Sequence, residues 1–188
     1  MTDLDFIASV LKNPFNKELF ARLGRMGLPE CYLTAGCLFQ TKWNEISGCA
    51  PDWGIKDYDV FYFDKQDLSW EAEDQVVRRV TAETTDLPIK VEIKNQARVH
   101  LWYSDRFGGE YPQLQSARAG IDLYLISCTS VGIEIETGNL YAPNGLGDLN
   151  SGVLCMNPRN PKPNLFRHKA ESYRKRWPWL QIIEGSCL

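Results

Sequence analysis

Residues 57–63 (DYDVFYF) limit the possible folds of this chain more than any other segment, because they combine a dense run of β-forming residues with two aspartates. Before them, residues 30–35 (ECYLTA) predict a short buried strand, and Gly36 permits a tight turn into a helix over about 37–47. After them, the amphipathic pattern of residues 69–83 predicts another helix. Strands and helices that interleave in this way predict an α/β (α+β) fold, with a mixed β-sheet flanked by helices.

Residues 88–102 (PIKVEIKNQARVHLW) alternate between apolar and polar positions almost without exception. A period of two over this length predicts two strands or one bent strand. The polar face of this segment would then present, in order, Lys90, Glu92, Lys94, Gln96, Arg98, His100 and Trp102.

Shorter elements are predicted at both ends of the chain. Two helices open it, the first capped by Asp3. The apolar stripe of that first helix consists of Leu4, Ile7, Ala8 and Leu11. Towards the other end, Ser116 caps a short helix, residues 128–136 form a strand, and a basic helix covers about 165–176 in a loop-rich remainder.

The domain organisation follows from the absence of any repeat, low-complexity tract or clear linker. We expect a single domain over residues 1–188. Its core would cover about 28–137, and a C-terminal extension would cover about 138–188.

Composition excludes several classes of protein. The net charge of −3 gives no overall attraction to nucleic acid or to an anionic membrane. No run approaches the ~20 apolar residues that a membrane span needs, and the acidic start MTDLDFIASV is not a secretory signal. We therefore expect a cytoplasmic protein with no membrane partner. The six cysteines form no C-x-x-C pair, so a zinc site is unsupported, and we expect all six to be reduced, buried thiols.

Asp57 and Asp59 are the residues most suggestive of chemistry. Two positions apart on a strand, they point to one face, with Cα atoms roughly 6.5–7 Å apart. Two carboxylates beside a buried strand repel each other, and a divalent cation relieves this repulsion. Glu92 on an adjacent strand would complete a set of three oxygen ligands of the kind that Mg²⁺ prefers. The structural alternative is two solvated aspartates at the start of a strand and a solvent-facing Glu92.

Other residues predict contacts with phosphate. Gly36 ends a strand and opens a helix, so the backbone there can approach an anion at the helix N-terminus. Lys94 or Arg98 can hold triphosphate oxygens. The C-terminal run Arg167, Lys169, Arg174, Lys175 and Arg176 either docks phosphate or RNA or forms a solvated helix face.

The arrangement resembles the DNA polymerase beta-type nucleotidyltransferase superfamily and, more closely, a family of small nucleotidyltransferase-like proteins. The likeness rests on Ala35-Gly36 before a helix with Trp43, and on the segments at 56–73, 91–103, 129–136, 143–149 and 174–180. It implies that Asp57, Asp59 and Glu92 bind Mg²⁺ (or Mn²⁺) and that Gly36 contacts the triphosphate. Cys37 follows Gly36 where the superfamily usually has serine or glycine, so a hydroxyl contact to phosphate is missing.

The resemblance implies a reaction in which an NMP group passes from an NTP to an acceptor hydroxyl and pyrophosphate is released. Glu92 would then be the ligand nearest the attacking oxygen. The acceptor, whether a small molecule, a protein or an RNA end, stays open. A non-catalytic nucleotide- or partner-binding module on the same fold is the alternative, and a metal-dependent hydrolase using the same carboxylates is a third reading.

Overall fold

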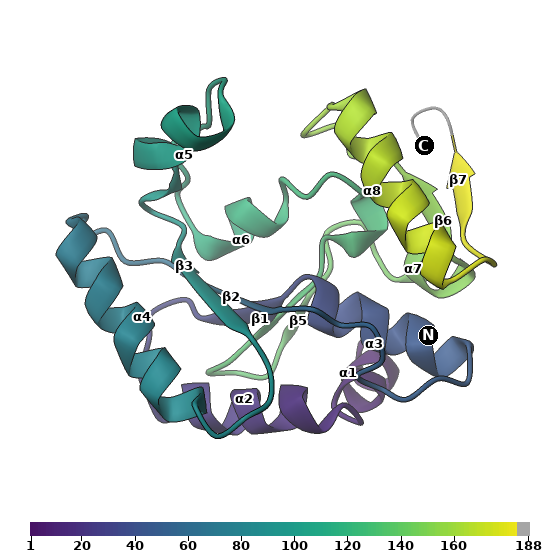
Figure 1. Ribbon diagram of the computed structural model, residues 1–188, viewed down its shortest axis with the longest axis horizontal. Helices are drawn as coiled ribbons and strands as arrows, with labels where there is room; N and C mark the ends of the chain where they lie inside the picture. The colour runs from purple at the N-terminus through teal and green to yellow at the C-terminus, as the bar shows by residue number, and fades with distance from the viewer. Residues whose placement is uncertain (184–188) are drawn as a thin grey trace.

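The computed structural model describes residues 1–183 and contains a mixed α/β arrangement (Figure 1). The helices are α1 (Asp3–Val10), α2 (Pro14–Gly24), α3 (Gly36–Ile46), α4 (Trp70–Thr84), α5 (Val99–Phe107), α6 (Ala117–Ile121), α7 (Gly147–Ser151) and α8 (Pro163–Arg176), with a 3-10 turn η1 (Ser127–Thr129). The strands are β1 (Tyr32–Thr34), β2 (Tyr58–Tyr62), β3 (Val91–Asn95), β4 (Gly132–Glu134), β5 (Leu140–Tyr141), β6 (Val153–Cys155) and β7 (Gln181–Ile183).

The main sheet has five strands in the order β3-β2-β1-β4-β5. Strands β2 and β3 run parallel, joined by the crossover helix α4, and the other pairs run antiparallel. The register places Asp59 opposite Thr34 on one side and opposite Glu92 on the other. A mixed sheet with flanking helices is therefore confirmed.

Strand β2 divides its side chains between the two faces of this sheet. Tyr58, Val60 and Tyr62 are buried on one face, where the Tyr58 ring meets Phe15 of α2 edge to face, 6.0 Å between centroids. Figure 1 shows α1 and α2 on that side of the strands, with α5, α6 and α8 on the other. Alternation along the strand therefore turns Asp59 and Phe61 towards the α5, α6 and α8 side.

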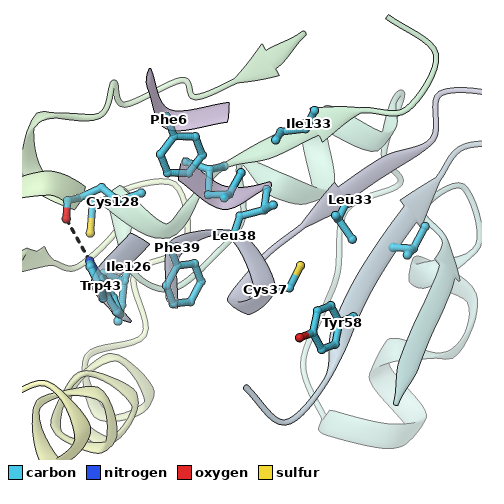
Figure 2. Packing of buried hydrophobic residues seen from close by; sticks show 14 of the residues in the cluster. Phe6, Leu33, Cys37, Leu38, Phe39, Trp43, Tyr58, Ile126, Cys128 and Ile133 are labelled. Atoms are coloured by element: carbon cyan, nitrogen blue, oxygen red, sulfur yellow. Dashed lines mark hydrogen bonds between the residues drawn. The ribbon is translucent and has the colours of Figure 1, made fainter. Parts of the chain in front are cut away.

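The C-terminal segment packs onto α3 through two tryptophans. The Trp43 indole donates to the carbonyl oxygen of Leu149 at 3.0 Å, the bond drawn dashed in Figure 2. The Trp177 indole donates to Asn44 Oδ1 at 3.0 Å, and the Trp43 and Trp177 ring centroids lie 5.3 Å apart. Both tryptophans are fully buried. Helix α8 is thereby fixed beside α3, next to the carboxylates of β2.

The prediction of strand throughout residues 88–102 is wrong beyond Asn95. The Asn95 side chain accepts hydrogen bonds from Asp64 N at 3.0 Å and from Ala97 N at 3.1 Å. These bonds end β3 in a turn, and helix α5 begins at Val99. The alternation of apolar and polar residues continues past this turn, so the alternation by itself does not show where the strand ends.

The first helix also differs from its prediction. Thr2, not Asp3, is the cap: its side chain accepts from Asp5 N at 3.2 Å, and the Asp5 carboxylate accepts in turn from Thr2 N at 2.9 Å. Leu4 of the predicted stripe is 77% exposed, whereas Phe6 and Val10 are buried against the core. Burying the larger aromatic ring removes more apolar surface from water than the predicted face would have removed.

Other predictions agree with the structure. Ser69 caps α4 and accepts from Ala72 N at 3.2 Å, Ser116 caps α6, and the C-terminal basic helix is present as α8. The predicted strand at 128–136 is shorter, because η1 precedes β4. Four elements in the segment read as loop-rich, β5, α7, β6 and β7, gave too short a pattern to be predicted.

The cysteines only partly follow expectation. Cys31, Cys37 and Cys128 are buried free thiols, and Cys49 is a free thiol that is partly exposed. Cys155 is disulfide-bonded, which corrects the expectation that it is reduced. Cys187 lies outside the described residues. Within residues 1–183, no helix has the length and apolar character needed to cross a membrane.

Candidate active site

Asp57, Asp59 and Glu92 lie on one face of neighbouring parallel strands. Asp57 directly precedes β2, Asp59 lies two residues on, and Glu92 is the register partner of Asp59 on β3. Burial raises the pKa of Asp59 to about 7, and the charges of Asp57 and Glu92 add to this rise. The strand register itself places Asp59 beside Glu92, on the adjacent strand that the sequence analysis expected.

A cavity of about 270 Å³ opens beside Asp57 and Asp59. Its lining comes from the start of α3, from β2, from the α6–η1 segment and from α8. Apolar and aromatic groups form much of its wall, namely Phe39, Phe61, Leu123, Tyr124, Leu125, Ile126 and Tyr173. The cavity therefore joins a carboxylate end to an apolar end, which suits a ligand with both a charged and a planar part.

Two lysines face the carboxylates. Lys90 forms an ion pair with Glu92, and Lys169 of α8 lines the cavity. Both lysines act to lower the pKa of Asp59, but burial and the neighbouring carboxylates outweigh them. In the sequence, Lys169 belongs to a basic run whose contacts could not be predicted. In the structure, it lines the same cavity as Asp57 and Asp59.

The three carboxylates differ in how well they are placed to bind a divalent metal ion. Among residues 1–183, no three His, Cys, Asp or Glu side chains are grouped as a metal ion would require, and Lys90 holds the Glu92 carboxylate. The carboxylates of Asp57 and Asp59 nevertheless supply hard oxygen ligands at a cavity wall. The raised pKa of Asp59 shows that its negative charge is poorly compensated. These two residues therefore fit a divalent cation, and Glu92 fits it if its carboxylate leaves Lys90.

The turn before α3 is strained. Ala35 has φ 62° and ψ −139°, a conformation that glycine adopts much more readily than alanine. Gly36 follows as the first helical residue, and both residues line the cavity. Strain of this kind persists where the surrounding structure holds the backbone in place, and here it brings the helix N-terminus to the cavity wall.

Replacing Ala35 by glycine should relieve this strain. Strain at such a residue costs about 1–3 kcal/mol. Glycine also makes the unfolded chain more flexible, which lowers the stability of the folded protein by about 0.4–1 kcal/mol. We expect Ala35→Gly to raise the free energy of unfolding by roughly 1 kcal/mol, as measured by urea denaturation. Ala82→Gly, in the ordinary helical backbone of α4, is the matched control and should lower it. A loss of stability in Ala35→Gly would show that the turn is not strained.

Cys37 does not present its side chain to the cavity. Its Sγ donates to the Thr34 carbonyl oxygen at 3.1 Å, and the side chain is fully buried. Figure 2 shows it within the cluster, near Leu33 and Tyr58. Burial raises the pKa of this thiol well above its usual value. Cys37 is not among the residues that line the cavity, so a contact between its side chain and a ligand there is not supported.

Lys94 lies on the face of the sheet that was predicted for it, whereas Arg98 does not. Lys94 is the register partner of Phe61, so it shares the carboxylate face of the sheet, two positions beyond Glu92. Arg98 is buried in an ion pair with Glu73 and donates to the Leu68 carbonyl oxygen at 2.7 Å. Its guanidinium is committed to the link between α4 and α5, because the strand that would have aligned it ends at Asn95.

Several cavity residues were missed by sequence reasoning. Tyr124 lines the cavity, and its hydroxyl oxygen lies 3.0 Å from that of Thr34 in β1, with which it shares a hydrogen bond. Gln40, one turn along α3 from Gly36, also lines the cavity. Nothing periodic marks Tyr124, since it lies in the irregular segment after α6. Gln40 could have been predicted, because it lies four residues after the glycine that opens the helix and therefore on the same helix face.

Comparison with known proteins decides the family. A family model described as "Nucleotidyltransferase" matches residues 21–182. The chain belongs to this nucleotidyltransferase family. The match spans α3, the three carboxylates and α8. Membership makes the chain a nucleotidyltransferase, a member of the class of enzymes that transfer an NMP group.

The fold of this nucleotidyltransferase is also found in a solved structure. An NMR structure described as revealing a CCA-adding enzyme head domain is similar to it with a TM-score of 0.76 and 22% sequence identity. The alignment covers 98% of this chain and 97% of that chain. No curated protein matches the sequence. The structural likeness shows the fold, and the family match shows the class of enzyme.

Proposed function

We propose that this nucleotidyltransferase moves an NMP group from an NTP to an acceptor hydroxyl in a reaction that depends on Mg²⁺ or Mn²⁺. The observation that carries the proposal is the position of Asp57 and Asp59 in the wall of a cavity that also borders the N-terminus of α3, with Glu92 opposite Asp59 on the neighbouring strand. The carboxylates suit the metal cation of a metal–triphosphate ligand, and the helix N-terminus at the same cavity suits its anionic phosphates.

Each residue has a distinct part in this proposal. Asp57 and Asp59 would hold the metal ion, which when bound polarises phosphoryl oxygens and balances developing negative charge. Glu92, released from Lys90, would be the third ligand and would take the proton of the acceptor hydroxyl. The backbone of Gly36 and Cys37 and the ammonium of Lys169 would contact the triphosphate. Lys94 would serve the same ligand from farther along β3.

The apolar end of the cavity supports a place for the base. Phe61 and Tyr124 lie there with ring centroids 5.9 Å apart, at an angle of 66°. Aromatic faces of this kind stack on nucleobases, and stacking is tolerant of base identity. The backbone carbonyl oxygens of Leu123 and Tyr124 accept hydrogen bonds from Asn160 and Asn157. We therefore expect modest discrimination among the four NTPs.

A transfer assay tests the reaction. Purified protein is incubated with Mg²⁺, each NTP in turn, and acceptors of three kinds: sugars and other small alcohols, proteins, and RNA 3′ ends. The structural likeness to a CCA-adding enzyme head domain supports including RNA ends. We expect equal amounts of pyrophosphate and nucleotide adduct. Free nucleotide without an adduct would indicate a hydrolase, and nucleotide binding without turnover for any acceptor would indicate a binding module.

Lys169→Met tests the proposed phosphate contact from α8. Lys169 is exposed and lines the cavity, so its removal should leave the unfolding temperature unchanged. We expect the Kd for Mg²⁺–NTP, measured by isothermal titration, to rise about tenfold, because hydrogen bonds to charged groups contribute about 1.5–3 kcal/mol. Lys175→Met, an exposed lysine of the same helix outside the cavity lining, is the control and should bind as wild type does. Equal affinities in both variants would remove Lys169 from the site.

A further inference from the structure

Gln40 on α3 is a buried polar residue whose role the proposed reaction does not explain. Its side chain lines the cavity, although the residue is only 6% exposed. The oxygen Oε1 accepts from Arg176 Nη1 at 2.8 Å. Within residues 1–183, the nitrogen Nε2 has no hydrogen-bond partner. This nitrogen is not one of the fully enclosed polar atoms that lack a partner, so its NH₂ group opens onto the cavity, where a ligand can accept a hydrogen bond from it.

The orientation of the Gln40 amide is fixed by its partner. A guanidinium group can only donate hydrogen bonds, so the atom that faces Arg176 must be the amide oxygen. The NH₂ group is therefore turned the other way, towards Gly36. A Cβ added at position 36 would collide with Nε2, so the amide lies directly against the helix-opening glycine.

Arg176 is itself held from several sides. Its Nη1 also donates to the carbonyl oxygen of Gly54 at 2.6 Å, and its guanidinium lies over the rings of Trp177 and Tyr173, 4.4 and 5.4 Å from the centroids. These contacts anchor it at the end of α8, which is fixed to α3 by Trp177. Arg176 is thus a rigid support for the Gln40 amide.

The position of Nε2 indicates which ligand group it would meet. It lies at the N-terminal end of an 11-residue helix, where the helix dipole favours an anion. Lys169 lines the same cavity. No side chain at 36 or 37 can reach this point, since Gly36 has none and the Cys37 thiol is turned into the core. A donor group at a helix N-terminus, in a cavity that a lysine also lines, suits a phosphate oxygen.

We propose that Gln40 is a phosphate-binding residue of this nucleotidyltransferase, with its amide NH₂ donating to the triphosphate beside Gly36, and that Arg176 is the positioning residue that orients it. This inference rests on the proposed NTP-dependent function and adds to it a side-chain donor that the Gly36-Cys37 turn lacks. It also gives a reason for glycine at position 36, because any Cβ there would displace the amide.

The test uses the full chain, with Mg²⁺–tripolyphosphate and the four Mg²⁺–NTPs as probes in isothermal titration. Gln40→Met keeps the length of the side chain but removes both NH donors. Gln40→Glu keeps the shape and the acceptor for Arg176 but replaces the donors with a negative charge, so it should remain folded. Gln181→Met, on exposed β7 away from the cavity, is the matched control.

We expect Gln40→Met to weaken binding of both tripolyphosphate and NTP by roughly tenfold or more, since a neutral donor to a charged acceptor is lost. Gln40→Glu should weaken binding further, and Gln181→Met should bind as wild type does. Unfolding temperatures without ligand, measured in parallel, separate lost binding from lost structure. Unchanged affinity in folded Gln40→Met and Gln40→Glu would overturn the assignment.

A double-mutant cycle tests the part of Arg176. If it acts by orienting Gln40, Arg176→Met should weaken binding in the wild-type background and have little further effect in Gln40→Met. Additive losses would overturn the orienting role. If the wild type binds neither tripolyphosphate nor any NTP, the proposed function itself fails. Binding by wild type with no effect at Gln40 refutes only the present inference.

Discussion

Asp59→Asn is expected to abolish nucleotide transfer and, at the same time, to stabilise the metal-free protein at pH 8. Activity should fall by roughly a thousandfold or more, because a bound metal ion supplies several kcal/mol of transition-state stabilisation. Stability should rise by about 2 kcal/mol, since a partly buried, repelled carboxylate is replaced by a neutral amide. Steady-state kinetics and urea denaturation of the same preparations measure the two effects.

The pH dependence of this stabilisation follows from the raised pKa of Asp59. The pKa is about 7 in the folded protein, because of burial and of the charges of Asp57 and Glu92, whereas the ordinary pKa of an aspartate is 3.8. The folded state then binds more protons than the unfolded state between about pH 4 and pH 7. This contribution to stability is therefore fully present below pH 4 and is lost as pH rises to 7. The difference between Asp59→Asn and wild type should be near zero at pH 4 and reach its maximum above pH 7.

Asp64→Asn is the matched control for this prediction. Asp64 lies just after the same strand and is partly buried, but it does not line the cavity. Its replacement should reproduce neither the loss of activity nor the gain in stability above pH 7. A stability difference between Asp59→Asn and wild type that stays constant from pH 4 to pH 8 would contradict the electrostatic account of Asp59.

Trp43→Ala is expected to be the most destabilising single change, lowering the free energy of unfolding by about 3–5 kcal/mol. The indole is fully buried, donates to the Leu149 carbonyl oxygen at 3.0 Å, and packs against Phe39 with centroids 4.8 Å apart. Its removal leaves a cavity and an unsatisfied carbonyl between α3 and the C-terminal segment. Since α8 carries Lys169 and Arg176, NTP affinity should fall along with stability.

Two further variants calibrate this effect. Trp43→Phe keeps a ring but loses the hydrogen bond, so it should cost about 1–2 kcal/mol. Trp70→Ala removes a tryptophan that is 62% exposed and should change stability by no more than about 0.5 kcal/mol. Urea denaturation followed by circular dichroism measures all three. A cost below about 1 kcal/mol for Trp43→Ala would mean that the C-terminal segment is not held through this residue.

The positions of the carboxylates could be predicted from the sequence because their residue types and their spacing both indicated a shared face of the sheet. The period of two put Asp57 and Asp59 on one face, and the interleaved helix at 69–83 made β2 and β3 parallel neighbours, which set Asp59 beside Glu92. Gly36 marked the turn into α3 for an equally local reason. These features depend on a few adjacent residues, so pattern and composition were sufficient.

The features that sequence analysis missed depend on contacts between distant segments. The turn at Asn95 is made by a side chain that reaches Asp64, 31 residues earlier, and it converts the predicted strand into α5. Arg98 then forms an ion pair with Glu73 and does not line the cavity. Gln40 becomes notable only through Arg176, 136 residues away. No local pattern carries such pairings, and the short strands β5 to β7 are too brief to show any period.

The most direct test of the central claim is the metal-dependent binding of NTP at Asp57 and Asp59. Thermal unfolding of wild type and of Asp57→Asn/Asp59→Asn is followed with Mg²⁺ alone, with each NTP alone, and with both together. Ligand that binds the folded state raises the unfolding temperature by mass action. We predict that wild type is stabilised by Mg²⁺ and NTP together, and that the double variant shows no ligand-dependent rise. An equal rise in both proteins, or none in the wild type, would contradict the assignment of these aspartates as the metal–nucleotide site.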